Sequence, residues 1–377
     1  MTDPSSAAAE TLATGARILI AGGGSAGHVQ PALAVAHALV EVDPTVSITC
    51  LGTQRGLETR LVPEAGFELV TVDEVKFTRT LRPELLRLPG RLRRVVRATR
   101  QIIAERNIDA VVGFGGYVAL PAYLAARGRA AVVVHEANAR AGIANKIGSR
   151  FADVVLTAVP DTGLRRARVV GNPVRRELTE LDRSGRQREA REYFGLDLDR
   201  PTLVVLGGSL GAVVFNQVFA AAAGDLDRAG VQVLHIHGRG KHLDVPVREP
   251  GRPPYVAREF VDRMDLLYAA ADLLVARSGA MTVAAVAAVG VPVLYVPLAF
   301  GNGEQRLNAT GQVTAGAARL IDEGDLTVPT VREQIIPLVT DPAALAAMAR
   351  VAASATDHAD EVVARVALAA ARKHRAR

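Results

Sequence analysis

The stretch Arg17-Ile18-Leu19-Ile20-Ala21-Gly22-Gly23-Gly24-Ser25-Ala26-Gly27-His28-Val29-Gln30-Pro31 decides the fold of the first half of the chain. An apolar run typical of a buried strand ends at three consecutive glycines, and apolar residues then recur at helical spacing from Val29 to Val40. A strand, a glycine turn and a helix start form a backbone cradle for an anion, because unpaired N–H groups and the helix dipole both favour negative charge. The motif therefore predicts phosphate binding beside His28.

The same stretch matches the Gly-x-Gly-x-x-Gly pattern of dinucleotide-binding proteins through Gly22, Gly24 and Gly27. That pattern also needs an acidic residue at the end of the second strand, about 20 positions further on. Here the second predicted strand, residues 47–51, is followed by Gly52-Thr53-Gln54. A nicotinamide cofactor is therefore disfavoured, and no cofactor is expected.

Composition indicates two domains with aliphatic cores. The chain has 377 residues, of which 49% are hydrophobic and only 4% aromatic, as is typical of parallel sheets covered by helices. A single cysteine, Cys50, excludes a disulfide framework and favours a reducing cytoplasm. Residues 1–15 are small and polar and are expected to form a disordered tail. The uncharged run 280–300 is broken by Gly290, Pro292 and Pro297, so it predicts a buried helix and strand rather than a transmembrane helix.

The basic character of the chain is concentrated between Lys76 and Arg100. This segment holds nine basic residues and one acid, a charge of +8, so the rest of the chain carries −2 of the total +6 (6 − 8). From Arg91 onward an apolar stripe at helical spacing alternates with arginines, which suits an anionic membrane surface. A solvated helix face remains the alternative. Nucleic acid is disfavoured because the segment offers a single aromatic residue, Phe77, for base stacking.

Strand-like and helical runs alternate along the whole chain, which predicts α/β domains with doubly wound parallel sheets. The pattern restarts at Leu203–Leu206, which leads into Gly207–Ala212 and another helix. We therefore predict two Rossmann-like domains, 16–171 and 172–358, with a C-terminal helix over 359–377 packing back on the first. Ligands of such sheets bind at the carboxyl ends of the strands.

Seven motifs in order resemble one family, the MurG family of bacterial lipid-linked N-acetylglucosaminyltransferases in peptidoglycan synthesis, which has the GT-B architecture of two domains facing across a cleft. They are Gly22–Pro31, Gly113–Tyr117, His135–Asn138, Gly171–Arg175, Gly207–Ala212, Arg277–Val283 and Gly303–Ala309. The resemblance implies an inverting transfer of N-acetylglucosamine from UDP-GlcNAc to the C4 hydroxyl of the muramoyl-pentapeptide carried on undecaprenyl diphosphate, which converts lipid I to lipid II. It also implies no catalytic metal and a peripheral position on the cytoplasmic face of the cell membrane.

The resemblance also implies roles for individual residues. It makes His28 the general base, although a histidine at a helix start can equally serve to bond the turn. Ser25, Ala26 and Gly27 would face the acceptor diphosphate, with donor contacts also open to them. The remaining implied contacts are Asn138 and Arg175 in the cleft, Ser209 at the UDP diphosphate, Val261 beside the uracil, Ala280, Met281, Thr282, Val283, Ala284 and Ala285 along the donor helix, and Gln305 at the donor sugar.

Two positions depart from the family pattern at the donor site. Ala285 replaces the usual glutamate, which would hold the ribose hydroxyls, and Leu210 replaces the usual glutamine of the second glycine turn. A lost charged hydrogen bond costs about 1.5–3 kcal/mol. Two alternatives therefore stay open: a relative that uses another nucleotide sugar in specialised metabolism, and a non-catalytic relative at the membrane surface.

Other motifs predict chemistry less well. Asp197-Leu198-Asp199 and Asp225-Leu226-Asp227 match the Asp-x-Asp metal motif but are interpreted as surface turns, and His235-x-His237 lacks a carboxylate or cysteine partner for a metal. Gly207-Gly208-Ser209-Leu210-Gly211 also fits a hydrolase nucleophile turn. A hydrolase would leave the first glycine turn unexplained.

Overall fold

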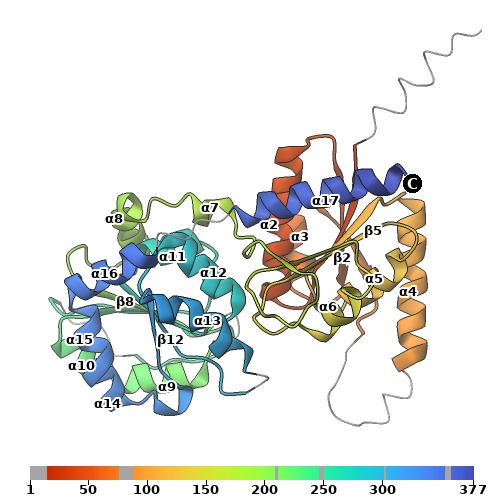
Figure 1. The fold of residues 1–377 in the computed structure, drawn as a ribbon. Helices are drawn as coiled ribbons and strands as arrows, with labels where there is room; N and C mark the ends of the chain where they lie inside the picture. The colour runs from red at the N-terminus through yellow and green to blue at the C-terminus, as the bar shows by residue number, and fades with distance from the viewer. Residues whose placement is uncertain (1–14, 76–87, 209–210, 246–249, 301–302, 353–357) are drawn as a thin grey trace, which may run out of the picture. The chain divides into compact units, whose positions relative to one another are not determined.

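The computed structural model describes residues 15–75, 88–208, 211–245, 250–300, 303–352 and 358–377 (Figure 1). The chain divides into two compact units. The first contains residues 1–175 and 358–377, and the second contains residues 176–357. The N-terminal tail predicted over 1–15 falls almost wholly outside the described residues, as does the first part of the basic segment, residues 76–87.

The first unit is built on a seven-stranded parallel sheet in the order β3-β2-β1-β4-β5-β6-β7. Its central strands are short apolar runs that are buried along almost their whole length, as expected for strands covered on both faces. The strands are β1 (Arg17–Ala21), β2 (Ser47–Thr53), β3 (Glu68–Val72), β4 (Ala110–Gly113), β5 (Ala131–Glu136), β6 (Val154–Thr157) and β7 (Arg168–Val169). Strands β2 and β3 are added on one side of β1, and β4 to β7 are added on its other side. Ligands of such sheets bind at the point between β1 and β4 where this order changes.

Successive residues of β1 supply two separate cores. Ile18 and Ile20 pack into the core under α2 and α17, whereas Leu19 and Ala21 pack into the core under α4 and α5. The helices of this unit are α2 (Ala26–Val42), α3 (Glu58–Glu64), α4 (Leu88–Glu105), α5 (Ala119–Ala126), α6 (Ile143–Gly148) and α17 (Ala359–Arg375).

The last helix of the chain, α17, belongs to the first unit and lies beside α2 (Figure 1). Val363, Ala367 and Leu368 on one face join the core that contains Ile18 and Ile20. At its end, Arg375 donates to the carbonyl of Gly15 and pairs with Asp109 at 2.6 Å. The C-terminus is therefore fastened to the edge of the first sheet where the strands begin.

The second unit repeats this plan with a six-stranded parallel sheet in the order β10-β9-β8-β11-β12-β13. Its strands are β8 (Thr202–Leu206), β9 (Gln232–Ile236), β10 (Tyr255–Arg258), β11 (Leu273–Ala276), β12 (Val293–Tyr295) and β13 (Ala318–Leu320). Its helices are α7 (Arg176–Thr179), α8 (Arg183–Phe194), α9 (Val213–Ala221), α10 (Ala223–Arg228), α11 (Met264–Ala270), α12 (Ala280–Val289), α13 (Glu304–Ala315), α14 (Val328–Thr330), α15 (Ile336–Val339) and α16 (Pro342–Ala352), with a 3-10 turn at Glu323–Asp325 and a π turn at Val331–Ile335. The predicted class of two doubly wound parallel α/β domains is confirmed.

Two local predictions were incomplete. The structure adds the edge strands β10 and β13, which are four and three residues long and only partly buried. The charged stretch 175–200, for which the sequence predicts one surface helix, holds two helices, α7 and α8. Within the described ranges no single helix is long and apolar enough to cross a bilayer, and the segments 328–339 and 342–352 pass that test only together, across a bend of 77°.

Candidate functional site

The first glycine turn connects β1 to α2 at the carboxyl edge of the first sheet. Gly24 has φ +89°, a conformation that glycine adopts without strain. The backbone N–H groups of Ser25, Ala26 and Gly27 have no hydrogen-bond partner within the described part of the chain. These donors point out of the first turn of a 17-residue helix, so the turn can bind an anion as the sequence predicts.

His28 lies on the first turn of α2 and is bonded to the predicted acceptor loop. Its Nδ1 atom is 3.0 Å from the Ser25 hydroxyl oxygen, so these two predicted site residues lie together. The His28 ring also packs on the loop after β4: a Cβ atom added at Gly115 would lie 3.1 Å from Nε2, and one at Gly116 would lie 3.2 Å from Nδ1. Both glycines have positive φ, so this loop passes the imidazole where a side chain would obstruct it.

A buried carboxylate organises the loop after β5. Glu136 Oε1 accepts hydrogen bonds from the backbone N–H and side-chain amide of Asn138, at 2.9 and 3.2 Å. Oε2 accepts from the Gly142 N–H and the Asn145 amide, both at 2.9 Å. The predicted cleft residue Asn138 is therefore held by a side chain that is only 3% exposed. Glu136 stood in a family motif, but no role was predicted for it.

The motif Gly171–Arg175 packs against the same edge. His135 Nε2 is 2.9 Å from the Gly171 carbonyl oxygen, and the Asn172 amide donates to the Ala137 carbonyl at 3.1 Å. Complete burial lowers the pKa of His135 to about 4, so its ring stays neutral near pH 7 and donates to Gly171. These bonds fix the backbone that leads to the half-buried Arg175, the last residue of the first unit in chain order before α7.

In the second unit the predicted donor residues gather around the start of α12. Met281 and Thr282 have backbone N–H groups without a partner among the residues described here. The preceding Ser278 is fully buried, and its hydroxyl has no hydrogen-bond partner among the described residues. Arg277, the residue before it, is paired with Glu323 and donates to the Val296 carbonyl at 3.0 Å. The helix start therefore has the free donors that an anion needs, and the residues before it are held in place.

The other predicted donor contacts are placed more precisely by the structure. The Gln305 side-chain oxygen already accepts a hydrogen bond from the Leu298 N–H at 3.0 Å, which leaves its amide NH₂ group for a ligand. Val261 is only 9% exposed, so a contact there would use its main chain. Ala285 is 6% exposed on α12 and offers no polar group. Ser209 and Leu210 lie outside the described residues.

The competing motifs have structural roles. His235 is buried between the Tyr255 hydroxyl and the Asn216 side-chain oxygen, at 2.8 and 3.1 Å, and burial lowers its pKa to about 3. Three acids of the two Asp-x-Asp matches form ion pairs. Asp225 pairs with Arg228 and Arg332, Asp227 pairs with Arg252, and Asp197 pairs with Arg200. Within the described ranges, no three His, Cys, Asp or Glu side chains are arranged to hold a metal.

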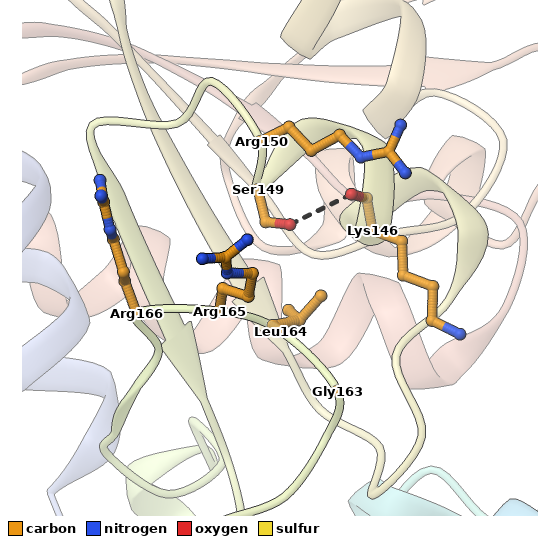
Figure 2. Close-up of a pocket in the computed structure, with 7 residues that line it drawn as sticks. All are labelled: Lys146, Ser149, Arg150, Gly163, Leu164, Arg165 and Arg166. Carbon is orange, nitrogen blue, oxygen red and sulfur yellow. Dashed lines mark hydrogen bonds between the residues drawn. The ribbon is translucent and has the colours of Figure 1, made fainter.

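A cavity of about 480 Å³ in the first unit is lined by basic side chains (Figure 2). Lys146 and Arg150 come from α6 and the turn that follows it, and Arg165 and Arg166 come from the loop before β7. Figure 2 shows Arg165 beside Ser149, while the ends of Lys146 and Arg150 project away from it. None of these four cations has an ion-pair partner in the described part of the chain.

Comparison with known proteins identifies the family. Residues 18–157 match the glycosyltransferase family 28 N-terminal domain, and residues 202–362 match the C-terminal domain of that family. The chain is 56% identical over 369 residues, and over 96% of both chains, to a Mycolicibacterium smegmatis protein named UDP-N-acetylglucosamine–N-acetylmuramyl-(pentapeptide) pyrophosphoryl-undecaprenol N-acetylglucosamine transferase. The chain belongs to the MurG family within glycosyltransferase family 28.

Other MurG family members and structures agree with this assignment. A Mycobacterium tuberculosis relative of the same name is 54% identical over 94% of this chain and 89% of its own. The crystal structure of Acinetobacter baumannii MurG superposes with a TM-score of 0.73 at 28% identity, over 93% of this chain and 99% of that one. The kitacinnamycin glycosyltransferase, with a TM-score of 0.65 at 17% identity, shares the fold.

Proposed function

We propose that this protein transfers N-acetylglucosamine from UDP-GlcNAc to the muramoyl C4 hydroxyl of undecaprenyl-diphosphate-linked muramoyl-pentapeptide, converting lipid I to lipid II in peptidoglycan synthesis. The observation that carries the proposal is the 56% identity, over 96% of both chains, to a curated transferase of that name. An anion-binding helix start in each unit supports it, because both the donor and the acceptor carry a diphosphate.

The reaction needs one base and a site for the leaving group. The acceptor C4 oxygen attacks the anomeric carbon of the donor sugar, the bond from that carbon to the UDP oxygen breaks, and UDP leaves with the bonding electrons. His28 accepts the hydroxyl proton, because an imidazole is the side chain best suited to take up a proton near neutral pH. Its bond to Ser25 orients the ring for that task. The N–H groups at the start of α12 stabilise the charge that develops on UDP.

The alanine at position 285 affects which nucleotide sugar the site can bind and how tightly. The family glutamate implied at this position is absent, and no polar side chain replaces it at residue 285 itself. The near full-length identity to curated transferases does not favour the alternative of another sugar donor in specialised metabolism. We therefore propose that UDP-GlcNAc is the donor and that this chain binds its ribose more weakly than members that keep the glutamate.

Calorimetric titration with UDP-GlcNAc, UDP-glucose and a TDP-sugar tests the donor, and lipid II formation from lipid I tests the transfer. We expect selective binding of UDP-GlcNAc and formation of lipid II. Ala285→Glu should tighten donor binding about 10- to 100-fold, as the gain of a charged hydrogen bond predicts. Preference for another nucleotide sugar would contradict the proposed donor, and absence of any donor binding would favour a non-catalytic relative.

We also propose that the protein works at the cytoplasmic face of the cell membrane, where its lipid acceptor is anchored. The arginines of α4 support this: Arg91, Arg93, Arg94, Arg97 and Arg100 are all exposed and have no ion-pair partner in the described residues. The apolar stripe that includes Val95, Val96 and Ile103 is buried on the sheet. The cations of the cavity in Figure 2 add to the positive charge of this unit.

A further inference from the structure

Glu58 is the first residue of α3, and its carboxyl group is fully buried behind the first glycine turn. Its Oε1 atom accepts hydrogen bonds from the backbone N–H and the hydroxyl of Thr53, at 2.8 and 2.9 Å. Its Oε2 atom accepts from the N–H of Gly24 at 2.8 Å. One side chain therefore joins the end of β2 to the loop that bears Ser25 and leads to His28.

The space for this carboxyl group is made by three glycines, one in the first turn and two on either side of Thr53. A Cβ atom added at Gly23 would lie 2.7 Å from Glu58 Oε1, one at Gly52 would lie 2.4 Å from its Cγ, and one at Gly56 would lie 1.9 Å from Oε2. Real Cβ atoms do not approach other heavy atoms so closely. Part of the glycine-rich character of the first turn therefore serves an internal carboxylate and not a bound phosphate.

This arrangement divides the donors of the turn into two sets. The N–H of Gly24 is committed to Glu58, whereas those of Ser25, Ala26 and Gly27 are left for an external anion. Fixing the Gly24 peptide also fixes where the next residue, Ser25, presents its hydroxyl to His28 Nδ1. A carboxylate placed behind the turn repels an anion from Gly23 and Gly24 and favours its binding at the helix start.

We propose that Glu58 is the positioning residue of the acceptor turn: through Gly24 it sets the Ser25–His28 pair and directs the acceptor diphosphate to the start of α2. The proposal rests on the function proposed above. Glu58 touches no substrate, so its effect is expected on the turnover number and on acceptor binding. Donor binding is expected to stay unchanged, because most of the donor contacts that the family resemblance implies lie in the second unit.

Glu58→Gln is the direct test. The carboxylate accepts from Thr53 and Gly24 with two oxygens, whereas a side-chain amide has one accepting oxygen and an NH₂ group that cannot accept. We expect kcat to fall about 10- to 100-fold, the size of an effect expected for a buried N–H left without an acceptor. UDP-GlcNAc titration should give the wild-type Kd. Unchanged kcat, or an equal loss of donor binding, would overturn the proposal.

Two further variants separate positioning from stability. Thr53→Val removes one bond to the same carboxylate but leaves the Gly24 contact, so it should lower the melting temperature and keep kcat within about threefold. Glu64→Gln, at an exposed site on the same helix where the carboxylate pairs with Arg60 at 3.0 Å, should change neither quantity. A Thr53→Val enzyme as slow as Glu58→Gln would show that the effect is one of stability alone.

A measurement on the wild type keeps the test independent of folding and activity. In ¹⁵N-glycine-labelled protein the Gly24 amide should exchange slowly with solvent and resonate downfield, because it donates to a buried carboxylate. Rapid exchange at Gly24 would contradict the proposal even if Glu58→Gln failed to fold. Wild-type protein that makes no lipid II would contradict the proposed function, and the Gly24 amide would still decide the role of Glu58.

Discussion

At the scale of single residues, the candidate site depends on glycines that make room for specific side chains. Gly23 admits the Glu58 carboxyl group, and Gly115 and Gly116 admit the His28 ring. A Cβ atom at Gly23 would overlap the carboxyl group, and one at Gly115 or Gly116 would crowd the ring, so these glycines make room for the two side chains. The same region contains the N–H groups at the start of α2, which have no hydrogen-bond partner in the described part of the chain.

The first prediction at this scale concerns His28. His28→Gln should lower kcat about 10²- to 10⁴-fold, because it removes the proposed base, and should leave the UDP-GlcNAc Kd unchanged. Single-turnover assays check this. His37→Gln, at an exposed position on the same helix, is the control. A variant with wild-type kcat would leave His28 with a role in bonding the turn.

The second prediction concerns His135 and pH. Because its pKa is lowered to about 4 in the folded protein, the unfolded chain binds a proton below pH 6.5 that the folded chain does not. This histidine should therefore cost about 2 kcal/mol of folding stability between pH 7 and pH 5, and the loss should level off only below pH 4. Urea unfolding at the two pH values should show a smaller loss for His135→Gln. His358→Gln, at an exposed site, should show the wild-type loss.

At this scale, the part of the candidate site that was predicted from the sequence is the first glycine turn with His28. Gly22–Gly27 and His28 form a pattern, and the structure places Ser25 and His28 together as that pattern suggests. Glu58 and Glu136 were missed as functional residues, because the sequence does not show that a single acid at a helix start or at a strand end is buried. Their burial depends on tertiary contacts between segments 34 residues apart in the first case. The spacing of Gly52 and Gly56 around Thr53 was the one local signal available.

At the scale of secondary-structure elements, burial explains which predictions held. The apolar runs 110–113 and 273–276 are predicted as strands from the sequence, and they form β4 and β11 with these bounds, because a central strand covered on both faces is a short apolar run. The edge strands β10 and β13 lack that pattern, because one side of each is not covered by another strand. Helix α4 followed its apolar stripe, with the arginines left on the exposed face.

The prediction at this scale concerns the charge of α4. Reversing three exposed arginines, Arg93, Arg94 and Arg97, to glutamate should weaken binding to phosphatidylglycerol vesicles by 100-fold or more, since each removed cation alone contributes about 1 kcal/mol. Vesicle sedimentation at low and high salt measures this, and phosphatidylcholine vesicles should bind neither protein. Arg188→Glu, at an exposed site on α8, is the control. Equal binding by both charge variants would indicate that these arginines form only a solvated face.

At the scale of the whole molecule, the chain leaves the first unit once and returns to it at the end. Residues 176–357 form a unit of their own, and α17 completes the core of the first.

Removing residues 358–377 should expose Ile18, Ile20 and the facing side of α2 and abolish cooperative unfolding of the first unit. Limited proteolysis with mass spectrometry should then find fragments of the second unit intact and the first degraded. Survival of both units would contradict this prediction.

The return of α17 also has a consequence for synthesis on the ribosome. The second unit is one continuous stretch, so it can fold as soon as residue 357 has emerged, whereas the first must wait for residues 358–377. Until those residues have emerged, the nascent N-terminal half holds an open aliphatic surface where α17 will bind. We therefore expect the half made first to mature last, and a nascent chain stalled before α17 to be a substrate for chaperones.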